Sequence, residues 1–114
     1  MEQIARAFSS HRFAETYDHL APDVRWVSVG GPTMQGRDAV IEACEQSTAM
    51  LSQTTTTFRS FRTVVGNDAV VVDSLAEYVE SDSDVSVVAS CDIYDFHDGK
   101  VAAITSYTVE VSPD

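Results

Sequence analysis

The second half of the chain alternates apolar and polar residues with the period of a β-strand. β-branched and aromatic residues, which suit a pleated sheet, dominate from Thr54 onward. Three short polar segments interrupt this pattern, and they consist of Gly66-Asn67-Asp68, Ser81-Asp82-Ser83-Asp84 and His97-Asp98-Gly99. These turn-forming residues predict four strands, at about 54–65, 69–80, 85–96 and 100–111. Because each connection is too short for a crossover helix, the strands are expected to pair antiparallel.

The first half of the chain has helical spacing instead. Segments 4–8 and 13–20 each repeat apolar residues at helical intervals, and the second pattern ends at Pro22. A short strand is predicted at 24–29, closed by Gly30-Gly31-Pro32, and a third helix at 38–51. Helices followed by a four-strand meander predict one α+β domain, residues 1–114, whose helices cover one face of a strongly curved sheet.

One carboxylate lies inside the aromatic strand at 85–96. The two-residue period places Asp92 on the same face as Ser90, Tyr94 and Phe96. If that face lines a core or a pocket, the ionised form loses hydration, so a partner must satisfy it or its pKa must rise. Asp92 is therefore the candidate catalytic residue. The alternative is a structural carboxylate that hydroxyl groups of Ser90, Ser106 or Thr108 satisfy.

The same parity on the other strands predicts the lining of a cavity that is mostly apolar, with a few hydroxyls. Such a surface suits a small hydrophobic or aromatic ligand. The aromatic side chains could equally fill the core. The predicted lining residues are Trp26, Ser28, Val72, Ser74, Ala76, Tyr78, Ser90, Tyr94, Phe96, Ile104, Ser106 and Thr108.

Charge and cysteine content narrow the classes of partner. The net charge is -11, from 18 acidic and 7 basic residues, so nucleic acid and anionic membranes are not expected as partners. The cysteines have no C-x-x-C spacing and the histidines no metal-ligand spacing, so neither a metal nor another cofactor is expected. No segment approaches the length of a signal peptide or membrane span, which predicts a cytoplasmic protein.

Both faces of the predicted sheet are apolar, and the helices can cover only one of them. A second copy of the chain is the simplest cover for the other, so we expect a homodimer through the outer face of the sheet.

Three motifs and their order carry a family resemblance. They are Leu20-Ala21-Pro22-Asp23-Val24-Arg25-Trp26, Gly36-Arg37-Asp38-Ala39-Val40 and Asp95-Phe96-His97-Asp98-Gly99-Lys100-Val101. With the predicted order of elements, the chain resembles the nuclear transport factor 2-like (NTF2-like) superfamily, which includes ketosteroid isomerases and SnoaL-like polyketide cyclases. The resemblance implies a cone-shaped α+β fold. It says far less about function, because one fold hosts many activities.

The isomerase pattern matches this chain at one position only. Asp92 sits where that family has the protonated carboxylic acid of its oxyanion hole. The family's general base falls on Ser28, and its two supporting tyrosines fall near Ile4 and Cys44. The resemblance therefore does not extend to the isomerase catalytic set, and steroid isomerisation by that mechanism is not expected.

The charge state of Asp92 depends on its neighbours. Arg59 or Arg62 could face the cavity and hold Asp92 as a base, as in limonene epoxide hydrolase-like relatives; without one, burial favours the neutral acid. Two classes of function remain open. The first is a cofactor-independent isomerase, cyclase, dehydratase or epoxide hydrolase that uses Asp92 as acid or base. The second is a non-catalytic ligand-binding or dimerisation module, in which aromatic side chains would fill the interior.

Overall fold

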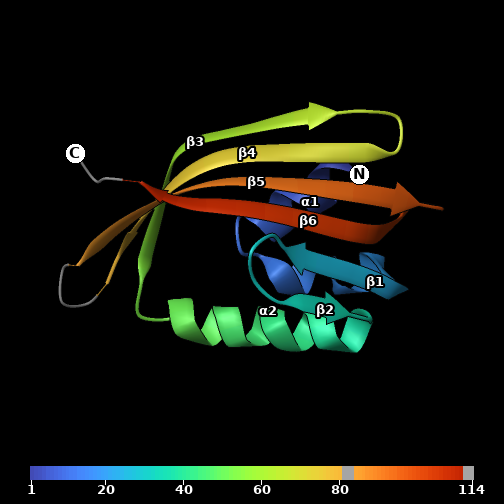
Figure 1. Cartoon of the computed structure of the whole chain (residues 1–114), viewed down its shortest axis with the longest axis horizontal. Helices are drawn as coiled ribbons and strands as arrows, with labels where there is room; N and C mark the ends of the chain where they lie inside the picture. Colours follow the sequence, from blue (N-terminus) through green and yellow to red (C-terminus); the bar gives the residue numbers. More distant parts are fainter. Residues whose placement is uncertain (81–83, 112–114) are drawn as a thin grey trace.

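The structure is a computed structural model that describes residues 1–80 and 84–111. Six strands form one sheet, in the order β2-β1-β6-β5-β4-β3. β1 and β6 pair parallel, and the other neighbours pair antiparallel. Figure 1 shows α1 behind β5 and β6, with α2 along the edge formed by β1 and β2. The elements are α1 Glu2–Ser9, a 3-10 helix η1 Phe13–His19, β1 Leu20–Ser28, β2 Thr33–Gln35, α2 Arg37–Leu51, β3 Thr55–Val65, β4 Ala69–Val79, β5 Val85–His97 and β6 Lys100–Val111.

The four long strands agree with the predicted bounds to within one residue. Asp98 and Gly99 connect β5 to β6 with φ values of 52° and 79°. Positive φ at both central positions is the requirement of a type I′ turn, which explains why Asp-Gly occurs here. Most of the turn predicted at Ser81-Asp82-Ser83-Asp84 lies outside the described residues.

The sheet is strongly curved because three of its strands carry bulges. Register shifts occur between Leu20 and Arg25 in β1, and opposite Asp95 and Phe96 of β5, where Ala102 of β6 is the extra residue. A third shift, between Phe58 and Ser60 in β3, leaves one residue without a directly opposite partner. Bulges bend a strand and increase its twist, so they wrap the sheet around the helices.

The first half of the chain differs from the prediction in three elements, the first being β1, which begins at Leu20 and not at residue 24. The second helix is a 3-10 helix, η1, in which Thr16 donates a hydrogen bond to the Phe13 carbonyl at 2.6 Å. Such a bond competes with regular α-helical pairing. Strand β2 was not predicted, because its three residues lie between Pro32 and Gly36. No helix in the described part of the chain is long and apolar enough to cross a membrane; the cytoplasmic location stays a prediction.

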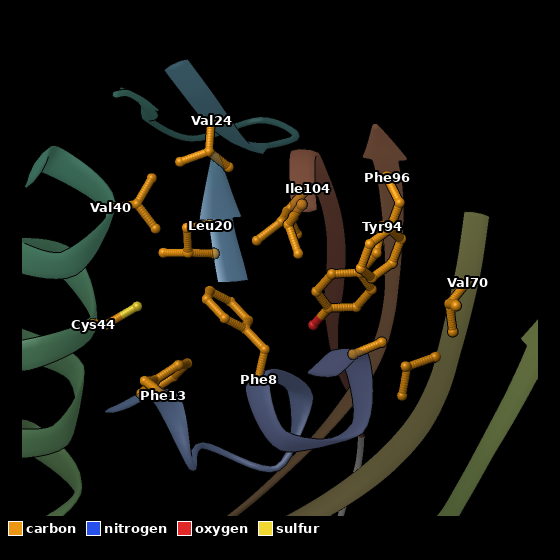
Figure 2. Packing of buried hydrophobic residues seen from close by; sticks show 13 residues of the cluster. Phe8, Phe13, Leu20, Val24, Val40, Cys44, Val70, Tyr94, Phe96 and Ile104 are labelled. Carbon is orange, nitrogen blue, oxygen red and sulfur yellow. The ribbon is translucent and has the colours of Figure 1, made fainter. Parts of the chain in front are cut away.

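The core lies between the concave face of the sheet, α1 and α2. Figure 2 shows Phe8 of α1 projecting toward Leu20 of β1, while Val40 and Cys44 approach from α2. The Phe8 ring meets the Phe13 and Trp26 rings edge to face, with centroids 5.0 Å apart in each case. Burial, followed by the charge of Glu45, raises the pKa of Cys44 to about 12, so this thiol stays protonated.

Candidate functional site

A cavity of about 350 Å³ opens between the concave face of the sheet and the helices. Its wall is mostly aromatic and aliphatic, with several hydroxyl groups and one carboxyl group. Ligand pockets commonly combine these features. The lining residues are Phe8, Ser9, His11, Phe13, Trp26, Ser28, Ser47, Met50, Leu51, Phe58, Ser74, Tyr78, Val88, Ser90, Asp92, Ser106 and Thr108.

The residues predicted from strand parity fall into two groups. Those that line the cavity are Trp26, Ser28, Ser74, Tyr78, Ser90, Asp92, Ser106 and Thr108. Those that are buried away from it are Val72, Ala76, Tyr94, Phe96 and Ile104. The second group shares the predicted face, but α1, β1 and neighbouring side chains cover these positions. Parity identifies a face of the sheet and does not show how far along each strand the cavity extends.

Asp92 is held in the wall by two serine hydroxyls. Ser9 at the end of α1 donates a hydrogen bond to Asp92 Oδ2 at 2.8 Å. Burial raises the pKa of Asp92, whereas hydrogen bonds with Ser106 and Ser9 and the nearby His11 imidazole act in the opposite direction. Burial dominates, so Asp92 keeps its proton at pH values where an exposed aspartate has lost it.

The hydrogen bonds around Ser9 have a definite direction. Ser9 Oγ lies 2.8 Å from Asp92 Oδ2 and 2.6 Å from Tyr94 Oη. A serine hydroxyl has one hydrogen, which is used toward Asp92, so Tyr94 must donate to Ser9. Figure 2 shows the Tyr94 oxygen directed toward α1. Tyr94, although away from the cavity, therefore orients the Asp92 carboxyl through Ser9.

Neither arginine considered from the sequence reaches Asp92. Arg59 Nε donates to Glu77 at 3.0 Å, and Arg62 donates to Asp73 at 3.2 Å, in both cases on the outer face of the sheet. The β3 bulge explains this orientation, because it lets Phe58 and Phe61 both face inward while the arginines face out. Among the described residues, no Lys or Arg lines the cavity.

Sequence reasoning missed His11, which lines the same cavity. Its backbone φ is 70°, and its Nε2 lies 2.9 Å from Tyr78 Oη. Burial lowers the pKa of His11 and the nearby Asp92 raises it, with burial the larger cause. The helical spacing of apolar residues in α1 could not predict where the His11 side chain lies, because His11 comes two residues after the helix ends. No group of three or more His, Cys, Asp or Glu residues within 1–80 and 84–111 is arranged to hold a metal ion.

The family model for the SnoaL-like domain matches residues 1–104. The chain belongs to the SnoaL-like domain family. A solved NTF2-like protein from Cytophaga hutchinsonii is 24% identical, with a TM-score of 0.84, and the match covers 95% of each chain. This likeness confirms the cone-shaped α+β fold. No curated protein matches the sequence.

Two further solved structures share the fold of this SnoaL-like protein. A proposed polyketide cyclase from Xanthomonas campestris is 18% identical, with a TM-score of 0.72, covering 91% of this chain and 83% of that one. A limonene epoxide hydrolase-like (LEH-like) enzyme from M. tuberculosis is 14% identical, with a TM-score of 0.66, covering 90% and 74%. At these identities the likeness shows the fold alone.

The positions that depart from the isomerase pattern have separate places in the SnoaL-like structure. Ser28 lies on the cavity wall, Cys44 is fully buried in the core, and Ile4 packs against that core. None of the three supplies a group that ionises near neutral pH beside Asp92. The polar groups that do approach Asp92 come from Ser9, Ser106 and His11.

Proposed function

We propose that this SnoaL-like protein is a cofactor-independent enzyme that moves a proton on a small, largely apolar molecule. Isomerisation, cyclisation, dehydration and epoxide opening belong to this class of reaction. One observation carries the proposal. The carboxyl group of Asp92 faces an apolar cavity, and none of the described residues that line this cavity is a Lys or Arg. An open cavity that reaches Asp92 favours an enzyme over an interior filled by aromatic side chains.

The chemistry follows from the environment of Asp92. Because burial raises its pKa, the carboxyl group is available as a neutral acid. It can donate its proton to an oxygen of the bound molecule as negative charge develops there. The carboxylate left behind accepts hydrogen bonds from Ser9 and Ser106, which limits the cost of ionisation. In an isomerisation the proton returns when the product oxygen releases it; in epoxide opening the product oxygen keeps that proton, and the attacking water gives up the proton that restores Asp92.

The structural neighbours support this class of reaction. The proposed polyketide cyclase and the LEH-like epoxide hydrolase have the same fold around their interiors. Cyclisation and epoxide opening both benefit from an acid that protonates a substrate oxygen. Low identity means that neither activity transfers directly to this chain.

The test begins with a thermal-shift screen of small aromatic and alicyclic ketones, esters and epoxides, since a bound ligand raises Tm. Each compound that binds is incubated with the protein in D₂O, and conversion or deuterium uptake is followed by mass spectrometry. We expect Asp92→Asn to lower the rate by about 10²- to 10⁴-fold while circular dichroism stays unchanged. Asp95→Asn is the matched control, because Asp95 lies on the same strand but is exposed.

Two results would count against the proposal. Turnover in Asp92→Asn equal to that of the wild type would remove Asp92 from the mechanism. Binding without any conversion or exchange, in the wild type as well, would identify a non-catalytic ligand-binding module instead.

We also propose that the protein is a homodimer through the outer face of the sheet. Tyr107 and Val109 of β6 are 47% and 61% exposed on that face. The same face carries arginines 59 and 62 beside Glu77 and Asp73. Charges of both signs on one patch allow it to face a second copy of itself across a two-fold axis.

Light scattering at micromolar concentration tests the dimer. We expect a dimer mass for the wild type and a monomer mass for Tyr107→Glu. Ala49→Glu is the control, because Ala49 is exposed on the helix α2 and not on the sheet. A wild-type monomer mass at every concentration would refute the proposal.

A further inference from the structure

Strand β3 forms one edge of the sheet and has a neighbouring strand on one side only (Figure 1). It pairs with β4, and within residues 1–80 and 84–111 no strand pairs with its other side. From Ser60 to Val65 the pairing with β4 is uninterrupted, because the bulge lies between Phe58 and Ser60. We call this regular segment, residues 60–65, the β3 edge.

The unpaired main-chain groups of the β3 edge belong to every second residue. Gly66 donates its N–H to the Ala69 carbonyl at 2.7 Å, so the main chain of Gly66 faces β4. This direction alternates along an antiparallel strand, so the N–H and C=O groups of Phe61, Thr63 and Val65 point away from β4. Such groups are open to pairing with an additional strand. Because they lie in the plane of the sheet, the edge remains available in a dimer formed through the outer face.

The side chains beside these open groups differ from one end of the edge to the other. The guanidinium of Arg6 in α1 lies 4.9 Å from the centre of the Phe61 ring. Arg6 is exposed and forms no ion pair within residues 1–80 and 84–111. Next along the strand, Thr63 donates a hydrogen bond to the carboxylate of Glu2. At the far end, Val65 is 51% exposed. The edge therefore presents a cation, a carboxylate and an apolar side chain in that order.

This order favours a peptide with one acidic residue over a second copy of the edge. Two copies paired about Thr63 would bring their Glu2 carboxylates together and would give Arg6 no acidic partner. The net charge of the chain is -11, which disfavours a partner with many acidic residues. A single carboxylate placed beside Arg6 avoids both difficulties.

We propose that the β3 edge binds an extended segment of another protein as an additional antiparallel strand, in which one acidic side chain lies opposite Phe61 and contacts Arg6. The residue opposite Thr63 is neutral, because an acid there would face Glu2. The residue opposite Val65 is apolar. Main-chain hydrogen bonds supply the affinity, and the alternate side chains supply the selectivity. None of these residues lines the cavity, so the inference does not rest on the proposed enzyme activity.

Synthetic peptides test the order of side chains. The probe Ac-Thr-Val-Thr-Thr-Thr-Glu-Thr-NH2 places its Val opposite Val65 and its Glu opposite Phe61, and the matched control peptide has Gln in place of Glu. Titration followed by ¹⁵N NMR of the protein measures both affinities. We expect the wild type to bind the Glu peptide about 3- to 10-fold more tightly, and Arg6→Gln to bind both peptides equally. Arg12→Gln is the control variant and should keep the preference, because Arg12 already pairs with Glu15.

N-methylated peptides test the main-chain pairing without any change to the protein. Methylation of the central Thr nitrogen, opposite Thr63, removes an N–H that the pairing uses and should abolish binding. Methylation of the next Thr, opposite Arg62, removes an N–H that points away and should change the affinity by less than about two-fold. At saturating peptide, deuterium exchange of the Phe61, Thr63 and Val65 amides should slow by about 10-fold or more.

Three results would overturn the inference. They are equal affinity of the wild type for the Glu and Gln peptides, amide protection that lies away from the β3 edge, and no binding at millimolar peptide. A mass that grows with protein concentration, without peptide binding, and that Thr63→Pro returns to its dilute value would identify a second copy as the occupant instead. Proline is tolerated where the replaced N–H faces away from the sheet, so this variant should fold.

Discussion

Phe8 connects α1 to the rest of the site, and its truncation gives a quantitative test of the packing. The side chain is 3% exposed and contacts the Phe13, Trp26 and Tyr94 rings at centroid distances of 5.0, 5.0 and 5.8 Å. A buried aromatic ring removes about 150–200 Å² from water, which at about 25 cal/mol per Å² contributes about 4 kcal/mol. Phe8→Ala should therefore lower the free energy of unfolding by about 3–5 kcal/mol.

For a chain of 114 residues, a loss of this size lowers Tm by about 15 °C. Urea unfolding followed by the fluorescence of Trp26, the single tryptophan, measures the change directly. Phe8→Leu is the graded control, because it keeps most of the apolar volume and should cost less than about 1.5 kcal/mol. A loss below about 1.5 kcal/mol for Phe8→Ala would refute this packing of α1 against the sheet, and with it the position of Ser9.

Three further changes test the site and the hairpin. Asp92→Asn should raise the free energy of unfolding at pH 7, because ionising a group of raised pKa opposes folding. That gain should vanish below pH 3.8, where the carboxyl is protonated in both states. The free energy of unfolding of the wild type should fall as the pH drops below 6.5, because His11 takes up a proton only on unfolding. In urea titrations at several pH values, His11→Asn should lack this part of the pH dependence. Gly99→Ala should lower the free energy of unfolding by about 1–2 kcal/mol, since φ is 79°. Gly31→Ala, whose φ is not positive, should change it much less; equal effects would contradict the turn assignment.

The long strands were predictable because local chemistry and the sheet agree there. Alternation over eleven or more residues and an Asp-Gly turn leave little freedom in where β5 ends and β6 begins. Short elements lack that redundancy. Strand β2 has only three residues, with Gly30-Gly31-Pro32 before it and Gly36 after it. The 3-10 helix η1 has too few residues for its apolar pattern to distinguish it from an α-helix.

The site was predicted only where it lies on strands. Asp92 and Tyr78 follow from the two-residue period, since each faces the concave side of its strand. Phe58 and Phe61 could not both be placed in the same way, because the β3 bulge that follows Phe58 changes the parity between them. His11 depends on a positive φ just beyond α1, which no spacing rule predicts for a histidine. The groups that act on Asp92 from the helical side were therefore the ones missed.

The central claim is that burial in the cavity wall raises the pKa of Asp92, so that its carboxyl group stays protonated at pH values where an exposed aspartate is ionised. ¹³C NMR titration of the aspartate carboxyl groups, with Asp92→Asn to assign the signal, measures this directly. We predict that Asp92 titrates above its ordinary value of 3.8. A midpoint at or below 3.8 would show that hydrogen bonds from Ser9 and Ser106 outweigh burial, and would contradict Asp92 as a neutral acid.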